Sequence, residues 1–215
     1  MEKKDLGHLR KSYDKNELNV EDISNNPLIF FESWFDQADK HPAIDEANAM
    51  SLATLGLDEF PKTRVVLLKS LTENGFQFYT NYHSEKGLSI EHHNKVGLSF
   101  FWPVLERQVI IKGIAEKLNA DANNKYFSSR PKGSQLGAIV SDQSKVIIDR
   151  SILESKLDAL EIEYLNKDVK RPQHWGGYNV TPKCIEFWQG RPNRLHDRVR
   201  CKWQGSYWNI ERLAP

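Results

Sequence analysis

The amino-acid sequence predicts a mainly β fold, an antiparallel β-barrel with helices packed outside it. Short apolar runs separated by turn residues follow one another closely over residues 50–118 and return over residues 177–212. This close spacing favours an antiparallel barrel over a parallel α/β sheet. Asn74-Gly75 stands between two of the runs. It is typical of a tight hairpin, because both central positions of a type I′ turn need positive φ.

The first predicted element is a helix that runs from about residue 26 to residue 40. The residues before it are polar and are expected to be mobile unless a ligand or a partner orders them. Asn26-Pro27 is a good helix start, since an N-cap residue is followed by proline at the first helical position. One face of the predicted helix is apolar and consists of Leu28, Phe31, Trp34 and Phe35.

The remaining elements follow the same reasoning. Strands are predicted at 50–55, 64–70, 76–81, 96–102 and 108–118, and later at 177–188, 198–203 and 207–212. Two helices are predicted between these groups, a short one at 121–129 and a longer one at 149–165. The longer helix has apolar side chains at helical spacing, which predict a core-facing stripe of Ile152, Leu153, Leu157, Leu160 and Tyr164. No repeat or linker is visible, so a mobile segment 1–25 and one domain over 26–215 are predicted.

Composition excludes several classes of protein. Of the 215 residues, 39% are hydrophobic and 11% aromatic, which argues against disorder. The formal net charge of +1 gives no reason to expect nucleic acid or an anionic membrane as a partner. A secretory signal and an apolar run long enough to span a membrane are not visible, so a soluble cytoplasmic protein is expected. Cys184 and Cys201 are expected to be reduced core thiols, and His92-His93 lacks the companions of a metal site, so no metal is predicted.

The most informative stretch of the chain lies near its C-terminus. Ile185-Glu186-Phe187-Trp188-Gln189-Gly190 is followed closely by Arg194-Leu195-His196-Asp197-Arg198. The charged cluster lies between two strand-like segments, where a barrel or sheet turns its side chains toward a ligand.

This pattern resembles the C-terminal signature of the pyridoxine/pyridoxamine 5′-phosphate oxidase family. Other motifs match that family in the same order from about residue 8 to the end: Arg64-Val65-Val66-Leu67-Leu68-Lys69, Phe78-Tyr79-Thr80-Asn81, Leu105-Glu106-Arg107-Gln108, Tyr126-Phe127-Ser128-Ser129-Arg130-Pro131, Gln143-Ser144 and Arg212-Leu213-Ala214-Pro215. The resemblance implies an FMN-binding split β-barrel of antiparallel Greek-key type, and a homodimer with FMN at the subunit interface. It also implies the oxidation of pyridoxine 5′-phosphate and pyridoxamine 5′-phosphate to pyridoxal 5′-phosphate, with O2 as electron acceptor and H2O2 as product.

Both FMN and such a substrate carry a phosphate, and a protein without a metal holds phosphate with Arg, Lys, hydroxyl and backbone N–H groups. No P-loop or Gly-rich dinucleotide fingerprint is present, so side chains must supply most of the recognition. Arg64 and Lys69 lie five positions apart, which predicts opposite faces of one strand and two different ligands, although solvated strand ends would look the same. By resemblance, Arg64 binds the FMN phosphate and Lys69 the substrate phosphate. The FMN site also takes in Val65, Val66, Leu67, Leu68, Lys69, Tyr79, Thr80, Lys86, Gln108, Gln143 and Ser144.

Tyr126, Arg130 and Ser134 offer two hydroxyls and a guanidinium, which suit a phosphate monoester. Tyr126 and Arg130 share a helix face if the helix extends that far, and Ser134 is expected in a loop beyond Pro131. A basic residue at an ordinary helix C-terminus would give the same pattern. The resemblance implies that the three residues bind the substrate phosphate.

The C-terminal cluster contains the residues nearest the expected chemistry. By resemblance, Trp188 and Arg198 contact the flavin, where an arginine can stabilise negative charge that develops on reduction. Arg194, Leu195 and His196 resemble substrate-binding residues. Arg194 and His196 are the predicted catalytic residues, since an arginine can cover a pyridine ring and a histidine can donate to its phenolic oxygen or shuttle a proton.

Three flanking features complete the prediction. Asp197 is expected to orient neighbouring basic groups. Arg10 and Tyr13 resemble residues that close over the substrate. Glu46 stands where the family often has an aspartate near the substrate.

Glu85 departs from the family, many of whose members have an arginine at this position. A charge-assisted hydrogen bond contributes roughly 1.5–3 kcal/mol, so a carboxylate facing the FMN phosphate would weaken binding about tenfold or more. Alternatively, Glu85 turns to solvent while Arg64 and Lys86 hold the phosphate. Glu85 lends some weight to a non-catalytic carrier of FMN or pyridoxal phosphate. A split-barrel flavin reductase and a nucleic-acid role for the basic run 191–202 are further alternatives.

Overall fold

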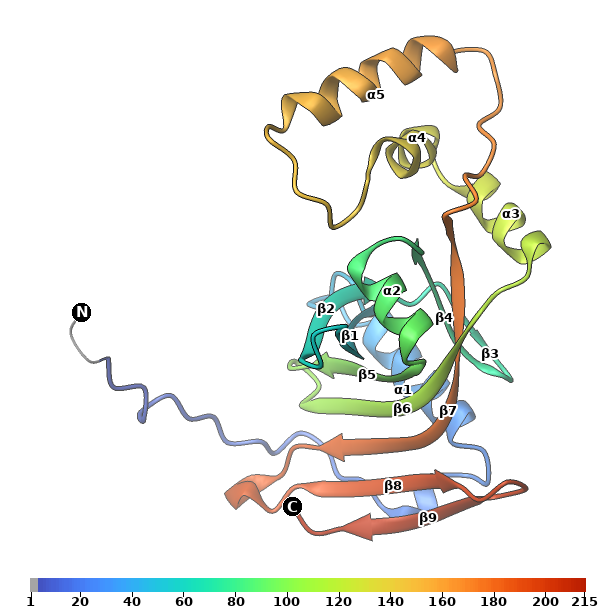
Figure 1. Cartoon of the computed structure of the whole chain (residues 1–215). Helices are drawn as coiled ribbons and strands as arrows, with labels where there is room; N and C mark the ends of the chain where they lie inside the picture. Colours follow the sequence, from blue (N-terminus) through green and yellow to red (C-terminus); the bar gives the residue numbers. More distant parts are fainter. Residues whose placement is uncertain (1–3) are drawn as a thin grey trace. The chain divides into compact units, whose positions relative to one another are not determined.

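The structure is a computed structural model that describes residues 4–215 and divides into two compact units (Figure 1). Residues 1–3, which belong to the predicted mobile segment 1–25, lie outside the described residues. The first unit contains residues up to 49, 99–111 and 183–215, and the second contains residues 50–98 and 112–182. The helices are α1 (Pro27–Asp39), α2 (Glu85–His92), α3 (Ala120–Ser129), α4 (Lys132–Val140) and α5 (Ser151–Glu163).

The strands form one curled antiparallel sheet. They are β1 (Ala49–Leu55), β2 (Pro61–Leu67), β3 (Ser70–Thr72), β4 (Gly75–Asn81), β5 (Lys95–Trp102), β6 (Arg107–Lys117), β7 (Trp175–Gln189), β8 (Asp197–Trp203) and β9 (Trp208–Leu213). Their order is β2-β1-β5-β6-β7-β4-β3, with β8 paired to β7 and β9 to β8. The long strand β7 pairs with β4 over residues 175–180 and with β8 over residues 184–189. The predicted antiparallel fold is confirmed.

The core of the first unit is aromatic. α1 begins at the predicted position, where the Asn26 side chain accepts the Leu28 N–H at 3.1 Å and Pro27 follows. Its buried face packs Phe31 against Phe100, with 5.0 Å between ring centroids. Trp34 packs edge-on against Phe187 of β7 at 5.4 Å. These contacts confirm the predicted apolar face of the helix.

A hairpin joins β3 and β4 in the second unit, as predicted, but its turn differs from the prediction. Thr72 pairs with Gly75, so Glu73 and Asn74 form the loop, and only Gly75 of the predicted pair has positive φ, at 129°. The Thr72 hydroxyl accepts the Asn74 N–H at 3.2 Å and thereby holds this loop. Any Cβ at position 75 would collide with the Val180 carbonyl oxygen, so the glycine is required by close packing as well as by φ.

Three helices follow β6, one more than predicted. α4 is the additional helix, and it packs beside α5 (Figure 1). Three partly buried side chains, Leu157 and Leu160 of α5 and Tyr164 in the turn that ends this helix, pack against a buried cluster. The cluster consists of Phe127, Leu136, Val169 and Trp175. The predicted stripe on this helix is therefore confirmed at these positions. The prediction is wrong for Ile152, which is 38% exposed.

The two cysteines are thiols in the first unit, where Cys201 is fully buried and Cys184 is half-buried. Burial, and secondarily the neighbouring Cys184, raise the pKa of the Cys201 thiol from 9.0 to about 12.

We expect Cys201 to resist an aromatic disulfide reagent at pH 8 in the folded protein and to react after denaturation. Since the folded pKa exceeds the unfolded one, this thiol should lower the stability as pH rises from about 9 toward 12. Fast native labelling of both cysteines would contradict the prediction.

Candidate functional site

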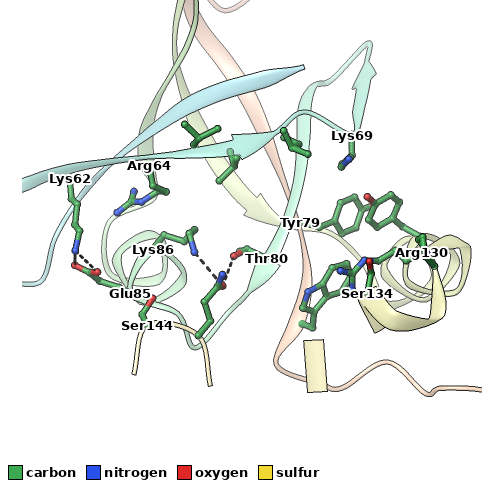
Figure 2. Close-up of a pocket in the computed structure, with 17 residues that line it drawn as sticks. Lys62, Arg64, Lys69, Tyr79, Thr80, Glu85, Lys86, Arg130, Ser134 and Ser144 are labelled. Atoms are coloured by element: carbon green, nitrogen blue, oxygen red, sulfur yellow. Dashed lines mark hydrogen bonds and ion pairs between the residues drawn. The ribbon is translucent and has the colours of Figure 1, made fainter. Parts of the chain in front are cut away.

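A cavity of about 650 Å³ lies in the second unit (Figure 2). Its walls come from β2, β4, the start of α2, the corner between α3 and α4, and the first residue of β7. The lining side chains are Lys62, Arg64, Val65, Val66, Leu67, Lys69, Tyr79, Thr80, Glu85, Lys86, Tyr126, Arg130, Pro131, Ser134, Gln143, Ser144 and Trp175. Five of them are cationic and one is a carboxylate, so the cavity attracts anions.

Arg64 lies at one end of the cavity, and only one of its two terminal guanidinium nitrogens has a hydrogen-bond partner among residues 4–215. Its Nη1 donates to the Thr54 hydroxyl at 2.7 Å and to the Leu52 carbonyl at 3.2 Å, both on β1. Its Nη2 is buried and has no hydrogen-bond acceptor among residues 4–215. Burial lowers the pKa of Arg64. A fixed, partly desolvated guanidinium with a spare donor suits an anionic oxygen.

Lys86 lies beside Arg64, and its hydrogen-bond partners in the described part of the chain are neutral. Its Nζ donates to the Ser84 hydroxyl at 3.2 Å and to the Gln143 side-chain oxygen at 3.3 Å. The same oxygen accepts the Thr80 hydroxyl at 3.2 Å. Burial and then the nearby Arg64 lower the pKa of Lys86. A dianionic group between the two cations would relieve their mutual repulsion.

A second group of polar side chains lies at the other end of the cavity. Figure 2 shows Arg64, Lys86 and Ser144 on one side, and Lys69, Arg130 and Ser134 on the other. The Arg130 guanidinium lies 4.4 Å from the centre of the Trp175 ring, and its Nη1 is buried without an acceptor in the described part of the chain. Burial lowers the pKa of Arg130. This end therefore offers a second, separate anion anchor.

Stacked aromatic side chains line this second end of the cavity and hold the Arg130 guanidinium in place. Tyr126 stacks on Tyr79 with 3.8 Å between ring centroids and an interplanar angle of 18°. Trp175 lies nearly parallel to both rings. Burial raises the pKa of Tyr126, so its hydroxyl remains a donor at neutral pH.

The structure does not meet the condition for one local prediction about these residues, and it shows that another is wrong. α3 ends at Ser129, and Arg130 is extended with ψ of 149°, so Tyr126 and Arg130 do not share a helix face. Ser134 lies in the first turn of α4, where a loop was predicted. The turn at Pro131 nevertheless brings the predicted trio to one end of the cavity.

The predicted separation of Arg64 and Lys69 onto opposite strand faces is also wrong. β2 ends at Leu67, and the Lys69 backbone N–H donates to the Gln77 carbonyl at 2.8 Å in the segment that leads into β3. Both side chains consequently line the same cavity. Leu68 is buried in the core at 6% exposure, and it does not line the cavity.

In the first unit, three predicted residues form an aromatic group. The Trp188 and His196 rings lie 4.7 Å apart between centroids, and Tyr13 lies 5.7 Å from Trp188 and 5.8 Å from His196. The Arg191 backbone N–H donates to His196 Nδ1 at 3.1 Å. This bond places the proton of the neutral imidazole on Nε2, which makes Nε2 a donor.

The charged residues around this group are held by carboxylates. Arg198, directly opposite Trp188 across β7 and β8, donates to Glu186 at 2.9 and 2.7 Å through Nε and Nη2. Asp197 accepts the Arg212 guanidinium at 2.8 Å and lies 3.6 Å from Arg191, which agrees with its predicted orienting role.

Arg194 and its neighbours are exposed. Asn193 and Arg194 both have left-handed backbone conformations, with φ of 58° and 62°. Such strain in a non-glycine residue is found more often at functional sites than elsewhere. Leu195 is 68% exposed, and Arg10 donates to the Gly7 carbonyl within its own segment at 3.1 Å.

Comparison with known proteins gives the family. A family model described as pyridoxamine 5′-phosphate oxidase matches residues 38–164, and one described as the pyridoxine 5′-phosphate oxidase C-terminal dimerisation region matches residues 175–215. A pyridoxine/pyridoxamine 5′-phosphate oxidase of Flavobacterium psychrophilum is 54% identical over 99% of this chain and 100% of its own length. The same enzyme of Flavobacterium johnsoniae is 55% identical over 98% of this chain and 99% of its own length. The chain belongs to the pyridoxine/pyridoxamine 5′-phosphate oxidase family.

Solved structures confirm the predicted split-barrel fold. The crystal structure of PhzG from Burkholderia lata, in complex with tetrahydrophenazine-1-carboxylic acid, has a TM-score of 0.88 and 27% identity, and covers 95% of this chain and 100% of that one. An FMN-binding protein from Nostoc punctiforme, described as related to pyridoxamine 5′-phosphate oxidase, has a TM-score of 0.70 and 12% identity, and covers 90% and 100%.

The structure adds site residues that sequence reasoning missed. Trp175 and Lys62 line the cavity, and Glu186 holds Arg198. The Trp175-Gly176-Gly177 sequence at the start of a strand is a signal for Trp175, since a Cβ at Gly177 would collide with the Tyr79 ring. Conversely, the predicted residue Gln108 lies in the first unit, where it donates to the Ser99 hydroxyl at 3.1 Å.

Two classes of feature are absent from the part of the chain that the structure describes. Residues 4–215 contain no group of three His, Cys, Asp or Glu side chains that could hold a metal ion. None of their helices is long and apolar enough to cross a membrane.

Glu46 is exposed in the segment before β1 and does not line the cavity.

Glu106 anchors the N-terminal segment of this oxidase-family chain. It is 1% exposed, has φ of 58°, and accepts the backbone N–H groups of Asp14 and Lys15 at 3.0 and 3.2 Å. We expect Glu106→Gln to weaken these charge-assisted bonds and to speed amide exchange at both residues roughly tenfold. Exchange at Leu18, whose N–H donates to Asp197, is the internal control. Unchanged exchange at Asp14 and Lys15, measured by mass spectrometry, would contradict the anchor.

Proposed function

We propose that this protein oxidises pyridoxine 5′-phosphate and pyridoxamine 5′-phosphate to pyridoxal 5′-phosphate with FMN as cofactor and O2 as electron acceptor. Pyridoxine 5′-phosphate and O2 give pyridoxal 5′-phosphate and H2O2; the amine substrate also consumes water and releases ammonia. One observation carries the proposal: a single cavity has, at one end on Arg64 and at the other on Arg130, a buried guanidinium nitrogen without an acceptor among residues 4–215. Two phosphorylated ligands, a flavin and a pyridine, would satisfy both.

The Arg64 end would hold the FMN phosphate. Arg64 Nη2 and Lys86 Nζ supply positive charge, while Thr80, Gln143 and Ser144 supply neutral polar groups. The first two residues of α2, Glu85 and Lys86, line the same region, where the positive end of the helix dipole favours an anion. The aliphatic run of Val65, Val66 and Leu67 offers an apolar wall for a flavin ring.

The Arg130 end would hold the substrate phosphate. Tyr126 and Ser134 supply hydroxyl donors beside the Arg130 guanidinium, and Lys69 adds a second cation. This set favours a phosphorylated substrate over an unphosphorylated one. It is the feature that argues against a flavin reductase.

The first unit supplies the remaining residues in this proposal. His196 Nε2 would donate to the phenolic oxygen of the pyridine ring, while Arg194 covers that ring and Trp188 and Arg198 contact the flavin. Residues 175–215 match the family's dimerisation region, and we place FMN at the interface of a homodimer. In this scheme residues 26–215 act as one catalytic domain, and the N-terminal segment, through Arg10 and Tyr13, closes over the substrate.

FMN held by Arg64 and Lys86 would supply the redox chemistry, namely a hydride acceptor for the substrate and a route for the electrons to O2. The protein contributes the positions of the two reactants relative to each other. Two phosphate anchors fix both reactants in one cavity, so the reaction becomes effectively intramolecular. Val65, Val66 and Leu67 and the stacked rings of Tyr79 and Tyr126 give the cavity apolar surfaces against which planar ligand rings can pack.

The test is anaerobic mixing of the FMN-loaded protein with pyridoxine 5′-phosphate, followed by flavin absorption. We expect bleaching that reverses in air while pyridoxal 5′-phosphate appears. Unphosphorylated pyridoxine is the matched control and should bleach the flavin much more slowly at equal concentration. A flavin that stays oxidised with the phosphorylated substrate would reject the proposal in favour of a carrier or of another substrate.

A further inference from the structure

Glu85 is the one carboxylate among the cavity-lining side chains within residues 4–215, and it is paired. Lys62 of β2 donates to both of its oxygens, at 2.7 and 2.5 Å (Figure 2). Glu85 is the first residue of α2, twenty-three positions along the chain from Lys62. The partner of this unexpected acidic residue is therefore another lining side chain of the same cavity.

Stability of the fold does not account for the pair. The Lys62 and Glu85 side chains are 55% and 49% exposed, and exposed ion pairs contribute little to folding. An electrostatic role of the pair inside the cavity is better supported, because Glu85 lies close to Arg64 and Lys86. Its charge partly offsets the lowering of their pKa values by burial. An unpaired Glu85 would repel a phosphate bound between them.

Lys62 has donor capacity beyond this pair. An ammonium group carries three N–H donors. Two are directed at the Glu85 oxygens, and the third is available to an oxygen of a ligand in the cavity. Glu85 thus fixes the end of a long, flexible side chain at the mouth of the anion-binding end.

We propose that Lys62 is a further ligand of the FMN phosphate, positioned by Glu85. The inference rests on the proposed function, since it takes the Arg64 end as the phosphate site. Lys62 cancels the charge of Glu85 and supplies its remaining N–H donor to the phosphate. The pair, which has no net charge, thus places a hydrogen-bond donor at the start of α2 where an unpaired carboxylate would repel the phosphate.

The experiment measures binding to the full chain freed of flavin, by quenching of flavin fluorescence. The ratio of FMN affinity to riboflavin affinity isolates the phosphate, since riboflavin lacks it. We expect Lys62→Met to lower this ratio about five- to tenfold, the effect of one partly exposed charge-assisted bond. The matched control is Lys117→Met, which removes the partner of Glu91 at the other end of α2 and should leave the ratio unchanged.

A second comparison separates contact from mere neutralisation of Glu85. In a Glu85→Gln background there is no carboxylate to cancel, while the amide oxygen of the glutamine can still accept a hydrogen bond from Lys62 and hold it in place. Lys62→Met should therefore still lower the ratio several-fold if Lys62 contacts the phosphate. An equal ratio for Glu85→Gln with and without Lys62→Met would overturn the inference. Unchanged riboflavin affinity and an unchanged melting temperature verify that each variant is folded.

Arg64→Met distinguishes this inference from the proposed function. A lower ratio for Arg64→Met, with no effect of Lys62→Met, would reject the role of Lys62 and leave the phosphate site in place. An unchanged ratio for Arg64→Met would instead reject the assignment of this end to the FMN phosphate.

Discussion

Replacing Arg194 by alanine is expected to lower kcat/KM for pyridoxine 5′-phosphate roughly 10- to 100-fold, the effect of one lost bond to a charged group. Flavin content should remain at the wild-type level, because Arg194 does not line the cavity that would hold the FMN phosphate. Its side chain is exposed, so truncation leaves no buried partner without a hydrogen bond. Steady-state rates normalised to flavin absorbance measure both quantities on one sample.

The backbone at Arg194 provides a matched second variant. With φ of 62°, any residue with a Cβ is strained there, and glycine is not. Arg194→Gly should lose as much activity as Arg194→Ala but melt roughly 2–4 °C higher than it, from about 1 kcal/mol of relieved strain. Loss of flavin with unchanged turnover per bound FMN would reject the substrate role of Arg194.

Neighbouring residues predicted the start of α1 and the positions of the strands, although the turn between β3 and β4 differs from the one predicted from Asn74-Gly75. Asn26-Pro27 predicted the start of α1 because capping depends on adjacent residues, and short apolar runs separated by turn residues located the strands. α4 was missed because its segment begins after Pro131 and contains Gly133 and Gly137, both unfavourable in a helix. Burial of Leu136 in the cluster with Phe127 stabilises it, and that packing is tertiary.

The candidate site shows the same division. Motifs located most residues of the cavity, since short conspicuous runs contain them. The ion pair of Lys62 with Glu85 and that of Glu186 with Arg198 join residues 23 and 12 positions apart, and no local pattern predicts them. Whether Arg64 and Lys69 lie on the same side of the sheet depends on where β2 ends. The end of a strand is set by backbone pairing with other strands, which a local sequence pattern does not show.

Replacing Arg130 by alanine is expected to raise the KM for phosphorylated substrates roughly 10- to 100-fold, with little change for unphosphorylated pyridoxine. The guanidinium is partly desolvated and stacked on Trp175, and its Nη1 has no acceptor within residues 4–215, so a phosphate oxygen would gain a strong, charge-assisted bond. Arg130→Lys should be intermediate, because an ammonium keeps the charge but not the planar stacking. Lys132→Ala is the matched control, since Lys132 is exposed and does not line the cavity.

The pH dependence gives an independent check on Arg130. A phosphate monoester loses its second charge below a pKa of about 6, so wild-type KM should rise as pH falls through that value. Burial lowers the pKa of Arg130, but an arginine is not deprotonated in proteins, so Arg130 stays protonated throughout this pH range. The rise should therefore be smaller in Arg130→Ala, where the cation that distinguishes the two charge states is gone. An equal rise in both proteins, or equal oxidation of pyridoxine with and without its phosphate, would show that Arg130 does not bind the substrate phosphate.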